Sequence, residues 1–227
     1  MNIETKYIRR ELSAVIEEAY RYFSVITITG PRQSGKTTLI RNLFPHLPYY
    51  SLENLDVRSF AENDPIAFLN QHVKGMILDE VHNAPNLLSY IQGMVDEDAD
   101  RRFILSGSSQ FAMLKKVSQS LAGRTAVFEL LPLSYSEVRE TVTDTPLDHL
   151  LFNGFYPAIY SGRNVPKFLY PAYMKTYLDK DVRDLLQIKD MMQFHMFIRL
   201  CAGRVGSLFK ASELANEIGI SSHTVTA

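Results

Sequence analysis

The sequence has few of the residues that mark several large classes of protein. Its 227 residues include one cysteine and no tryptophan. A single cysteine excludes an internal disulfide framework and fits a reducing compartment. No apolar run approaches the length that spans a bilayer, and the first six residues hold no signal-peptide stretch. We therefore expect a cytoplasmic protein that has no membrane partner.

An excess of charge of either sign is also missing. There are 24 Lys and Arg against 25 Asp and Glu, which gives a net charge of −1. This balance argues against a nucleic-acid surface spread over the whole molecule and leaves only a local basic patch open. The six histidines lack metal-ligand spacing, so no zinc site is expected. With 46% hydrophobic residues, the chain can bury the core of a globular protein.

Strand and helix patterns alternate over the first part of the chain. Buried strands are expected at 25–29, 49–52, 75–79, 102–106 and 126–130, where the residues are mostly β-branched or apolar. Helical patterns cover 7–22, 37–44, 56–71 and 87–95, and Pro65 must break or kink the third of them. Strands separated by single helices imply parallel crossovers. The predicted fold class is therefore α/β, a three-layer parallel sheet with helices on both faces.

The pattern changes after Pro132. Short helices are expected at 134–140 and 147–152, and residues 168–200 carry apolar side chains at helical spacing. We predict an α/β domain over 1–135, a smaller helical domain over 136–200, and the start of a helix-turn-helix or winged-helix segment over 201–227.

A phosphate-binding pattern follows the first expected strand. The segment from Gly30 to Thr37 matches G-x-x-x-x-G-K-[ST] at every fixed position. Glycines let backbone N–H groups cradle phosphate oxygens, and the helix that follows adds the positive end of its dipole. Lys36 would reach the β- and γ-phosphates, and the Thr37 hydroxyl would ligate Mg²⁺. The predicted nucleotide-binding residues are Gly30, Pro31, Arg32, Gln33, Ser34, Gly35, Lys36, Thr37 and Thr38.

Two acids end the third expected strand, in Gly75-Met76-Ile77-Leu78-Asp79-Glu80. We predict that Asp79 holds Mg²⁺, directly or through water. Glu80 is the predicted general base that orients and deprotonates the attacking water. A strand that ends in a solvated acidic turn is the alternative interpretation of this pair. His82 follows closely and either contacts the site or has a structural role.

Two further groups are candidates for the chemistry. The fourth strand ends in hydroxyl residues, and Ser106 or Ser108 would sense the γ-phosphate or the water if that strand lies beside the phosphate loop; a helix cap is the alternative. Arg124 is the best candidate for an arginine that stabilises charge, against the alternative of a solvated loop residue. Arg101 and Arg102 precede a strand and so belong at the wrong end of the sheet.

Together these segments resemble a prokaryotic family of AAA-type P-loop ATPases. The matching segments are ITGPRQSGKTTL, YYSLENLDVRSFAENDP, MILDEVHNAPNL, FILSGSSQFAMLKKVSQSLAGR, LLPLSYSEV, GFYPAIY and YMKTYLDKDVRDLLQIKD. The resemblance implies ATP as the nucleotide and a sheet in which the serine-ended strand lies next to the phosphate-loop strand. It also supports a role for Arg124, in the same subunit or in a neighbour of a homo-oligomer. The resemblance also implies that a winged-helix segment and then a domain similar to restriction endonucleases follow in the family, and we expect this chain to lack the second of these.

Residues 211–225 have the cadence of a helix-turn-helix. Leu214 and Ala215 would pack inward, Gly219 would make the turn, and Ser221 would cap a second helix from which Val225 faces back. A helix hairpin without a nucleic-acid role is the alternative. The sequence stops at Ala227, fewer than two turns into that helix, which suggests a fragment. We therefore expect DNA as a partner only of a longer protein, not of this chain alone.

Two functions from different classes follow. The first is a Mg²⁺-dependent ATPase that couples hydrolysis to a movement of its helical part. The second is a nucleotide-gated DNA-binding switch with negligible turnover. A P-loop kinase is disfavoured, because a base that activates water at Glu80 competes with phosphoryl transfer to a substrate.

Overall fold

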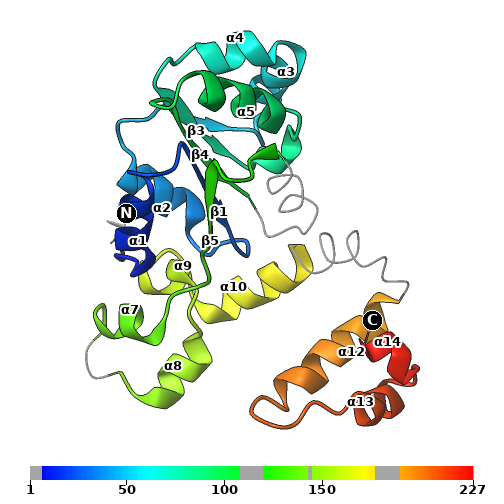
Figure 1. The fold of residues 1–227 in the computed structure, drawn as a ribbon. Helices are drawn as coiled ribbons and strands as arrows, with labels where there is room; N and C mark the ends of the chain where they lie inside the picture. The colour runs from blue at the N-terminus through cyan, green and yellow to red at the C-terminus, as the bar shows by residue number, and fades with distance from the viewer. Residues whose placement is uncertain (1–6, 108–119, 143–144, 177–189, 227) are drawn as a thin grey trace. The chain divides into compact units, whose positions relative to one another are not determined.

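The computed structural model describes residues 7–107, 120–142, 145–176 and 190–226 of the chain. The chain divides into two compact units between Pro166 and Lys167. The first unit holds a parallel sheet with its helices, and the second unit is helical in the residues described (Figure 1). The predicted domain boundaries at residues 135 and 200 stay a prediction.

All five predicted strands form, each within one residue of the expected bounds. They are β1 (Val25–Thr29), β2 (Tyr49–Ser51), β3 (Gly75–Asp79), β4 (Arg102–Ser106) and β5 (Thr125–Glu129). Every pairing is parallel, and the strand order is β2-β3-β4-β1-β5. The predicted fold class is thereby confirmed, as is the place of the serine-ended β4 beside β1.

Helices cover both faces of this sheet because successive strand residues point to opposite sides. On one face, Val25, Leu78 and Phe103 pack against α3 (Leu55–Asn63), α4 (Pro65–Asn70) and α5 (Leu87–Glu97). On the other face, Ile26, Ile77 and Ile104 pack against α1 (Leu12–Ala19) and α2 (Lys36–Leu43). Burying each of these side chains contributes about 1.5–3 kcal/mol. The result is the three-layer arrangement that the alternating sequence pattern predicts.

Two helix predictions are resolved by local chemistry. The pattern over 56–71 is split at Pro65, which opens α4, while the Asp64 side chain accepts the Ala67 N–H at 3.0 Å as its cap. The pattern over 7–22 is helical only over α1. The Glu11 N–H donates to the Glu137 carboxylate, and residues 20–22 form turns, so the amphipathic pattern is longer than the helix.

Beyond β5, the regular elements of the described chain are all helices. In the first unit, α7 (Tyr135–Arg139) starts with a capping box of Ser134 and Glu137, and α8 (Leu147–Asn153) and α9 (Pro157–Tyr160) follow. These confirm the helices expected at 134–140 and 147–152. The boundary between the units falls at the start of α10 (Pro166–Tyr173), and α12 (Met191–Ala202) lies in the second unit. The part of the predicted 168–200 helical stretch at 177–189 lies outside the described residues.

The predicted helix pair is also present in the second unit. It consists of α13 (Ala211–Ile218) and α14 (Ser222–Thr226). Leu214 and Ala215 are buried, and Gly219 makes the turn with φ 79°. The Ser221 hydroxyl accepts the Thr224 N–H at 3.1 Å, so it caps the second helix as predicted. Across the ranges that the structure describes, no helix has the length and apolarity to cross a membrane.

Gly75 generates a test of the sheet. It has φ +102°, and a Cβ there would lie 1.6 Å from the carbonyl oxygen of Arg102 on β4. Gly75→Ala should therefore lower the free energy of unfolding by about 2–4 kcal/mol, through backbone strain and a displaced strand. Gly93→Ala is the matched control, because this glycine lies in α5 with open space around it. The control should raise the free energy of unfolding by about 1 kcal/mol. Urea denaturation measures both, and equal effects would contradict the strand contact.

Candidate functional site

The predicted site residues meet at one edge of the sheet, where the parallel strands β1, β3 and β4 all end. Residues 30–35 connect β1 to α2 there, Asp79 ends β3, and Ser106 ends β4. In open parallel sheets, ligands bind outside the carboxyl ends of the strands. The sheet therefore places the loop and the acids where a ligand site is expected.

The loop has the conformation of a phosphate cradle. Gly30 has φ 142°, and a Cβ on it would lie 2.2 Å from the carbonyl oxygen of Leu130, so only glycine fits beside the end of β5. Gln33 and Gly35 have φ 62° and 97°, which bends the backbone into α2. Alternating backbone conformations of this kind turn successive N–H groups inward, next to the positive end of a helix dipole. This loop is therefore suited to an anion.

Lys36 lies inside the loop. Its ammonium donates to the carbonyl oxygens of Gly30 at 2.9 Å and Pro31 at 3.0 Å, and its side chain is buried. Burial lowers the pKa of Lys36, and the carboxylates of Glu80 and Asp79 oppose that shift. The ammonium is held by acceptors of the loop itself, which phosphate oxygens can replace.

Asp79 is the centre of the polar contacts at this edge. Its Oδ2 accepts the hydroxyl of Thr37 at 2.6 Å and that of Tyr49 at 2.7 Å. Its Oδ1 accepts the hydroxyl of Ser106 and the N–H of Glu80. Thr37 and Asp79, which the sequence predicts to share Mg²⁺, are thus in direct contact.

The oxygen atoms of Thr37 and Asp79 fit a hard divalent cation, which prefers carboxylate and hydroxyl oxygens. In the part of the chain that the structure describes, no group of three or more His, Cys, Asp and Glu could hold a metal. A single carboxylate and a hydroxyl are what Mg²⁺ uses when phosphate oxygens and water complete its coordination. These residues therefore suit a cation that binds together with a phosphorylated ligand.

Glu80 and His82 form the other half of the acidic edge. Glu80 has left-handed backbone geometry with φ 55°, uncommon outside glycine, and it starts the 3₁₀ turn η1 (Val81–Asn83). Its Oε2 lies 3.1 Å from Nδ1 of His82. His82 therefore lies beside the predicted general base, and whether its role is functional or structural stays a prediction.

Comparisons with known proteins agree with this geometry. Residues 22–139 match the AAA domain family. The chain belongs to this family. Residues 144–227 match a domain of unknown function, DUF8612. The chain is therefore a P-loop ATPase domain of the AAA family, followed by a C-terminal domain without a described role.

The curated relatives of the chain are uncharacterized, so they do not identify an activity. Uncharacterized protein Rv2008c of Mycobacterium tuberculosis and uncharacterized protein Mb2031c of Mycobacterium bovis are each 29% identical to the chain over 223 residues. The matches cover 95% of this chain and 49% of each relative, so the chain spans about half their length.

Solved structures resemble the chain only distantly. The Walker-type ATPase PABY2304 of Pyrococcus abyssi has a TM-score of 0.48 and 15% identity, and the match covers 88% of this chain and 77% of that chain. A single-residue variant of RuvB from Thermotoga maritima has a TM-score of 0.46 and 18% identity over 96% of this chain and 83% of that chain.

Arg124 of the AAA domain lies away from the loop. It precedes β5, and its carbonyl oxygen accepts the N–H of Val25 at the start of β1. Its guanidinium pairs with Asp96 at 2.6 and 2.8 Å. A strand of five residues is about 16 Å long, so Arg124 and the loop occupy opposite edges of the sheet. The prediction that Arg124 acts on a phosphate is therefore wrong for a phosphate held by the same chain, and stays a prediction for a neighbouring subunit.

The remaining predicted residues vary in their placement. Arg101 and Arg102 lie at the amino edge, as expected from their place before β4. Thr38 is exposed on α2, and Arg32 and Gln33 of the loop are also exposed. Ser108 lies outside the described residues, so its predicted catalytic role stays a prediction. Ser106 contacts Asp79, which joins the end of β4 to the acidic edge.

Tyr49 is a site residue that the sequence pattern did not identify. It starts β2 opposite Ile77 of β3, two residues before Asp79, and its hydroxyl donates to Asp79 at 2.7 Å. Burial raises the pKa of Tyr49, and the hydrogen bond to Asp79 adds to that shift, so the hydroxyl keeps its proton and acts as a donor.

Tyr49→Phe tests this donor. It removes a hydrogen bond to a charged acceptor and should lower the free energy of unfolding by about 1.5–3 kcal/mol. Tyr50→Phe is the matched control, because the next hydroxyl along β2 pairs with a ring nitrogen of His72 at 2.8 Å instead. The control should cost about 1 kcal/mol. Urea denaturation measures the free energy of unfolding of both variants. A smaller loss in Tyr49→Phe than in Tyr50→Phe would contradict the hydrogen bond from Tyr49 to Asp79.

Proposed function

We propose that the AAA domain binds ATP with Mg²⁺ and hydrolyses it. The observation that carries the proposal is the 2.6 Å contact between the Thr37 hydroxyl and the Asp79 carboxylate, at the start of the helix that the loop opens. Two oxygen ligands from different elements converge beside an anion cradle, which suits a metal-bound triphosphate better than a single phosphate.

Each residue has a distinct role in this proposal. The loop N–H groups and Lys36 hold the phosphates, and Lys36 exchanges its two carbonyl acceptors for phosphate oxygens. Thr37 and Asp79 hold Mg²⁺, which when bound neutralises charge on the phosphates. Glu80 accepts a proton from the attacking water as the bond between the β–γ bridging oxygen and the γ-phosphorus breaks, leaving ADP and inorganic phosphate. Glu80 must first leave its contact with His82.

Glu80→Gln tests the hydrolytic part. The amide keeps the size of the side chain but cannot take the proton, so phosphate release should fall by about 10²–10⁴-fold. ATP affinity, measured by calorimetry in the presence of Mg²⁺, should stay close to that of the unsubstituted protein. Glu97→Gln, on the exposed end of α5 toward the opposite edge, is the control and should leave both quantities unchanged. Normal turnover in Glu80→Gln would remove Glu80 from this role.

A nucleotide-gated DNA-binding switch is the second candidate. The helix pair of α13 and α14 favours this function, because DNA-binding helix-turn-helix proteins use such a pair. Leu214 and Ala215 are buried, and Gly219 makes the turn between the two helices. In either case we propose that the nucleotide state changes the conformation of the C-terminal region. Vigorous multiple-turnover phosphate release would count against a static switch.

The position of Arg124 gives a test of assembly. If it stabilises charge at all, it must do so on the phosphate of a neighbouring copy in a homo-oligomer, since its own loop lies at the other edge of the sheet. Lys36→Ala and Arg124→Ala should each be inactive alone. Mixed in equal amounts, they should regain part of the phosphate release, because a Lys36→Ala copy can supply Arg124 to the intact loop of its neighbour. Full activity of Arg124→Ala alone, or no recovery on mixing, would contradict this role.

A further inference from the structure

The phosphate loop is bound by an arginine, Arg10, that has no role in the proposed hydrolysis of ATP. Arg10 precedes α1, is only 6% exposed, and donates to four acceptors in three segments. Its Nη1 donates to the carbonyl oxygen of Ser34 at 2.9 Å. Its Nη2 donates to the carbonyl oxygens of Leu131 at 2.8 Å and Pro132 at 3.2 Å, and its Nε pairs with Glu137 at 3.0 Å.

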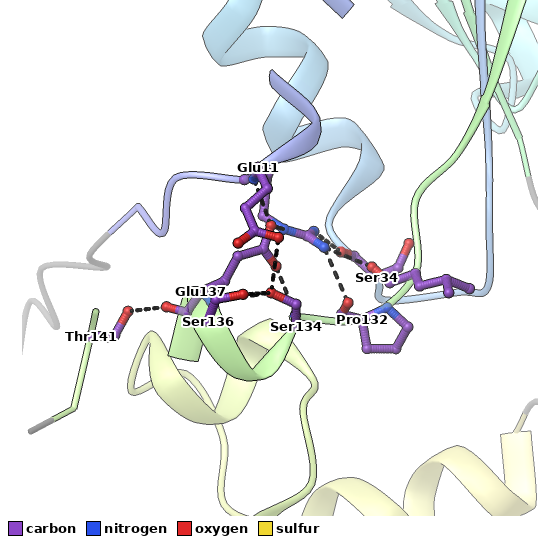
Figure 2. A network of polar contacts seen from close by, with 9 residues as sticks. Glu11, Ser34, Pro132, Ser134, Ser136, Glu137 and Thr141 are labelled. Carbon is purple, nitrogen blue, oxygen red and sulfur yellow. Dashed lines mark hydrogen bonds and ion pairs between the residues drawn. The ribbon is translucent and has the colours of Figure 1, made fainter. Parts of the chain in front are cut away.

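Glu137 completes the network on the far side of Arg10. Its Oε1 accepts the N–H of Glu11 at 2.7 Å, and its Oε2 accepts the N–H of Ser134 at 2.8 Å. The Ser134 hydroxyl accepts the N–H of Glu137 at 3.1 Å in return. Figure 2 shows Glu11, Ser34, Pro132 and Glu137 drawn together around this point, although they come from distant parts of the sequence. The loop, the start of α1 and the chain leaving β5 are therefore fixed to one another.

The contact with Ser34 sets the direction of a loop amide. In a trans peptide, the C=O and the following N–H point to opposite sides of one plane. Because the Ser34 carbonyl points toward Arg10, the N–H of Gly35 points away from Arg10. Gly35 lies close to this contact, since a Cβ on it would be 3.7 Å from Nη1 of Arg10. Arg10 thus orients a donor that a phosphate group would meet.

The network is costly, which argues that it has a role beyond stability. A buried ion pair gives back little more than the energy lost in removing both charges from water, and apolar residues of similar size often serve a core equally well. Unlike an apolar side chain, a guanidinium is a rigid fork of N–H donors that can bind several carbonyl oxygens at fixed angles. Arg10 uses that fork on three backbone carbonyls and one carboxylate.

We propose that Arg10 is a positioning residue for nucleotide binding: it holds the Ser34–Gly35 peptide in its phosphate-binding orientation and couples that orientation to residues 131–137. The inference rests on the proposed function. Residues 131–137 lead from β5 into α7. A change in the conformation of the loop would therefore alter the conformation of the chain where it leaves the sheet.

Arg10→Lys tests the positioning. Lysine keeps the charge but loses the fork, so the dissociation constants for ATP and ADP with Mg²⁺ should rise by about tenfold or more. KM should rise by more than kcat falls, because Arg10 does not touch the reacting atoms. Arg101→Lys is the matched control. Arg101 is 8% exposed and donates to backbone carbonyls of Leu69 and His72 at the opposite edge. That variant should lose stability in urea but bind nucleotide within about twofold of the unsubstituted protein.

The two failures can be told apart. If the unsubstituted protein binds ATP and Arg10→Lys binds it equally well, the positioning role is overturned while the proposed function stands. If the unsubstituted protein does not bind ATP, both fall. If Arg10→Lys and Arg101→Lys weaken binding equally, the effect is one of general stability, and the inference is again overturned.

A second measurement needs no substitution. Coupling is reciprocal, so a network that favours nucleotide binding must itself be favoured by nucleotide. Hydrogen exchange followed by mass spectrometry should show slower exchange in peptides containing the amides of Glu11, Ser134 and Glu137 when ADP and Mg²⁺ are added. Protection confined to the loop at 30–37, with none at 131–137, would overturn the coupling.

Discussion

The contact between Thr37 and Asp79 depends on the parallel sheet. The two residues lie 42 positions apart: Asp79 ends β3, whereas Thr37 lies in the first turn of α2, which follows β1, and β4 lies between β1 and β3. They meet because parallel strands end at a common edge, and because Ser106 at the end of β4 binds Asp79 from the strand between them. Antiparallel placement of any one of these strands would send its terminal residue to the other edge. The parallel direction of the strands therefore brings the residues of the site to one edge of the sheet.

The charged groups described at this edge all have partners within the chain. Lys36 is held by loop carbonyls, Asp79 by three hydroxyls, and Glu80 by His82. Such pairing lowers the cost of burying the charges. In the proposed function, a metal-bound phosphate would substitute for contacts that already exist. Glu80 is the exception, because in the proposed function its contact with His82 would have to break before its carboxylate could face a water molecule.

Much of the fold was predictable because the strands are short β-branched or apolar runs, three of which are followed or ended by Gly30, by Asp79 and Glu80, and by Ser106. The loop was predictable because its glycines and Lys36 form a contiguous motif. Tyr49 and Arg10 were not, since their contacts depend on the sheet register and on the chain returning from β5 to the loop. The expected helix at 7–22 was too long for a related reason. Its first residues carry an amphipathic pattern, but Arg10 and the backbone N–H of Glu11 are bound to Glu137.

The two arginines illustrate how position decides a role that residue type alone leaves open. Arg124 follows Gly123 in a turn, yet it precedes β5 and so lies at the amino edge. Arg10 belongs to no motif, yet the return of the chain after Leu130 brings the carbonyls of Leu131 and Pro132 to the same guanidinium that binds Ser34. An arginine at the amino edge can meet a phosphate only through a second copy, whereas one behind the loop acts within its own chain. Regulation by assembly and regulation by the segment after β5 would thus act on the same loop from different residues, and substitutions at Arg124 and Arg10 separate them.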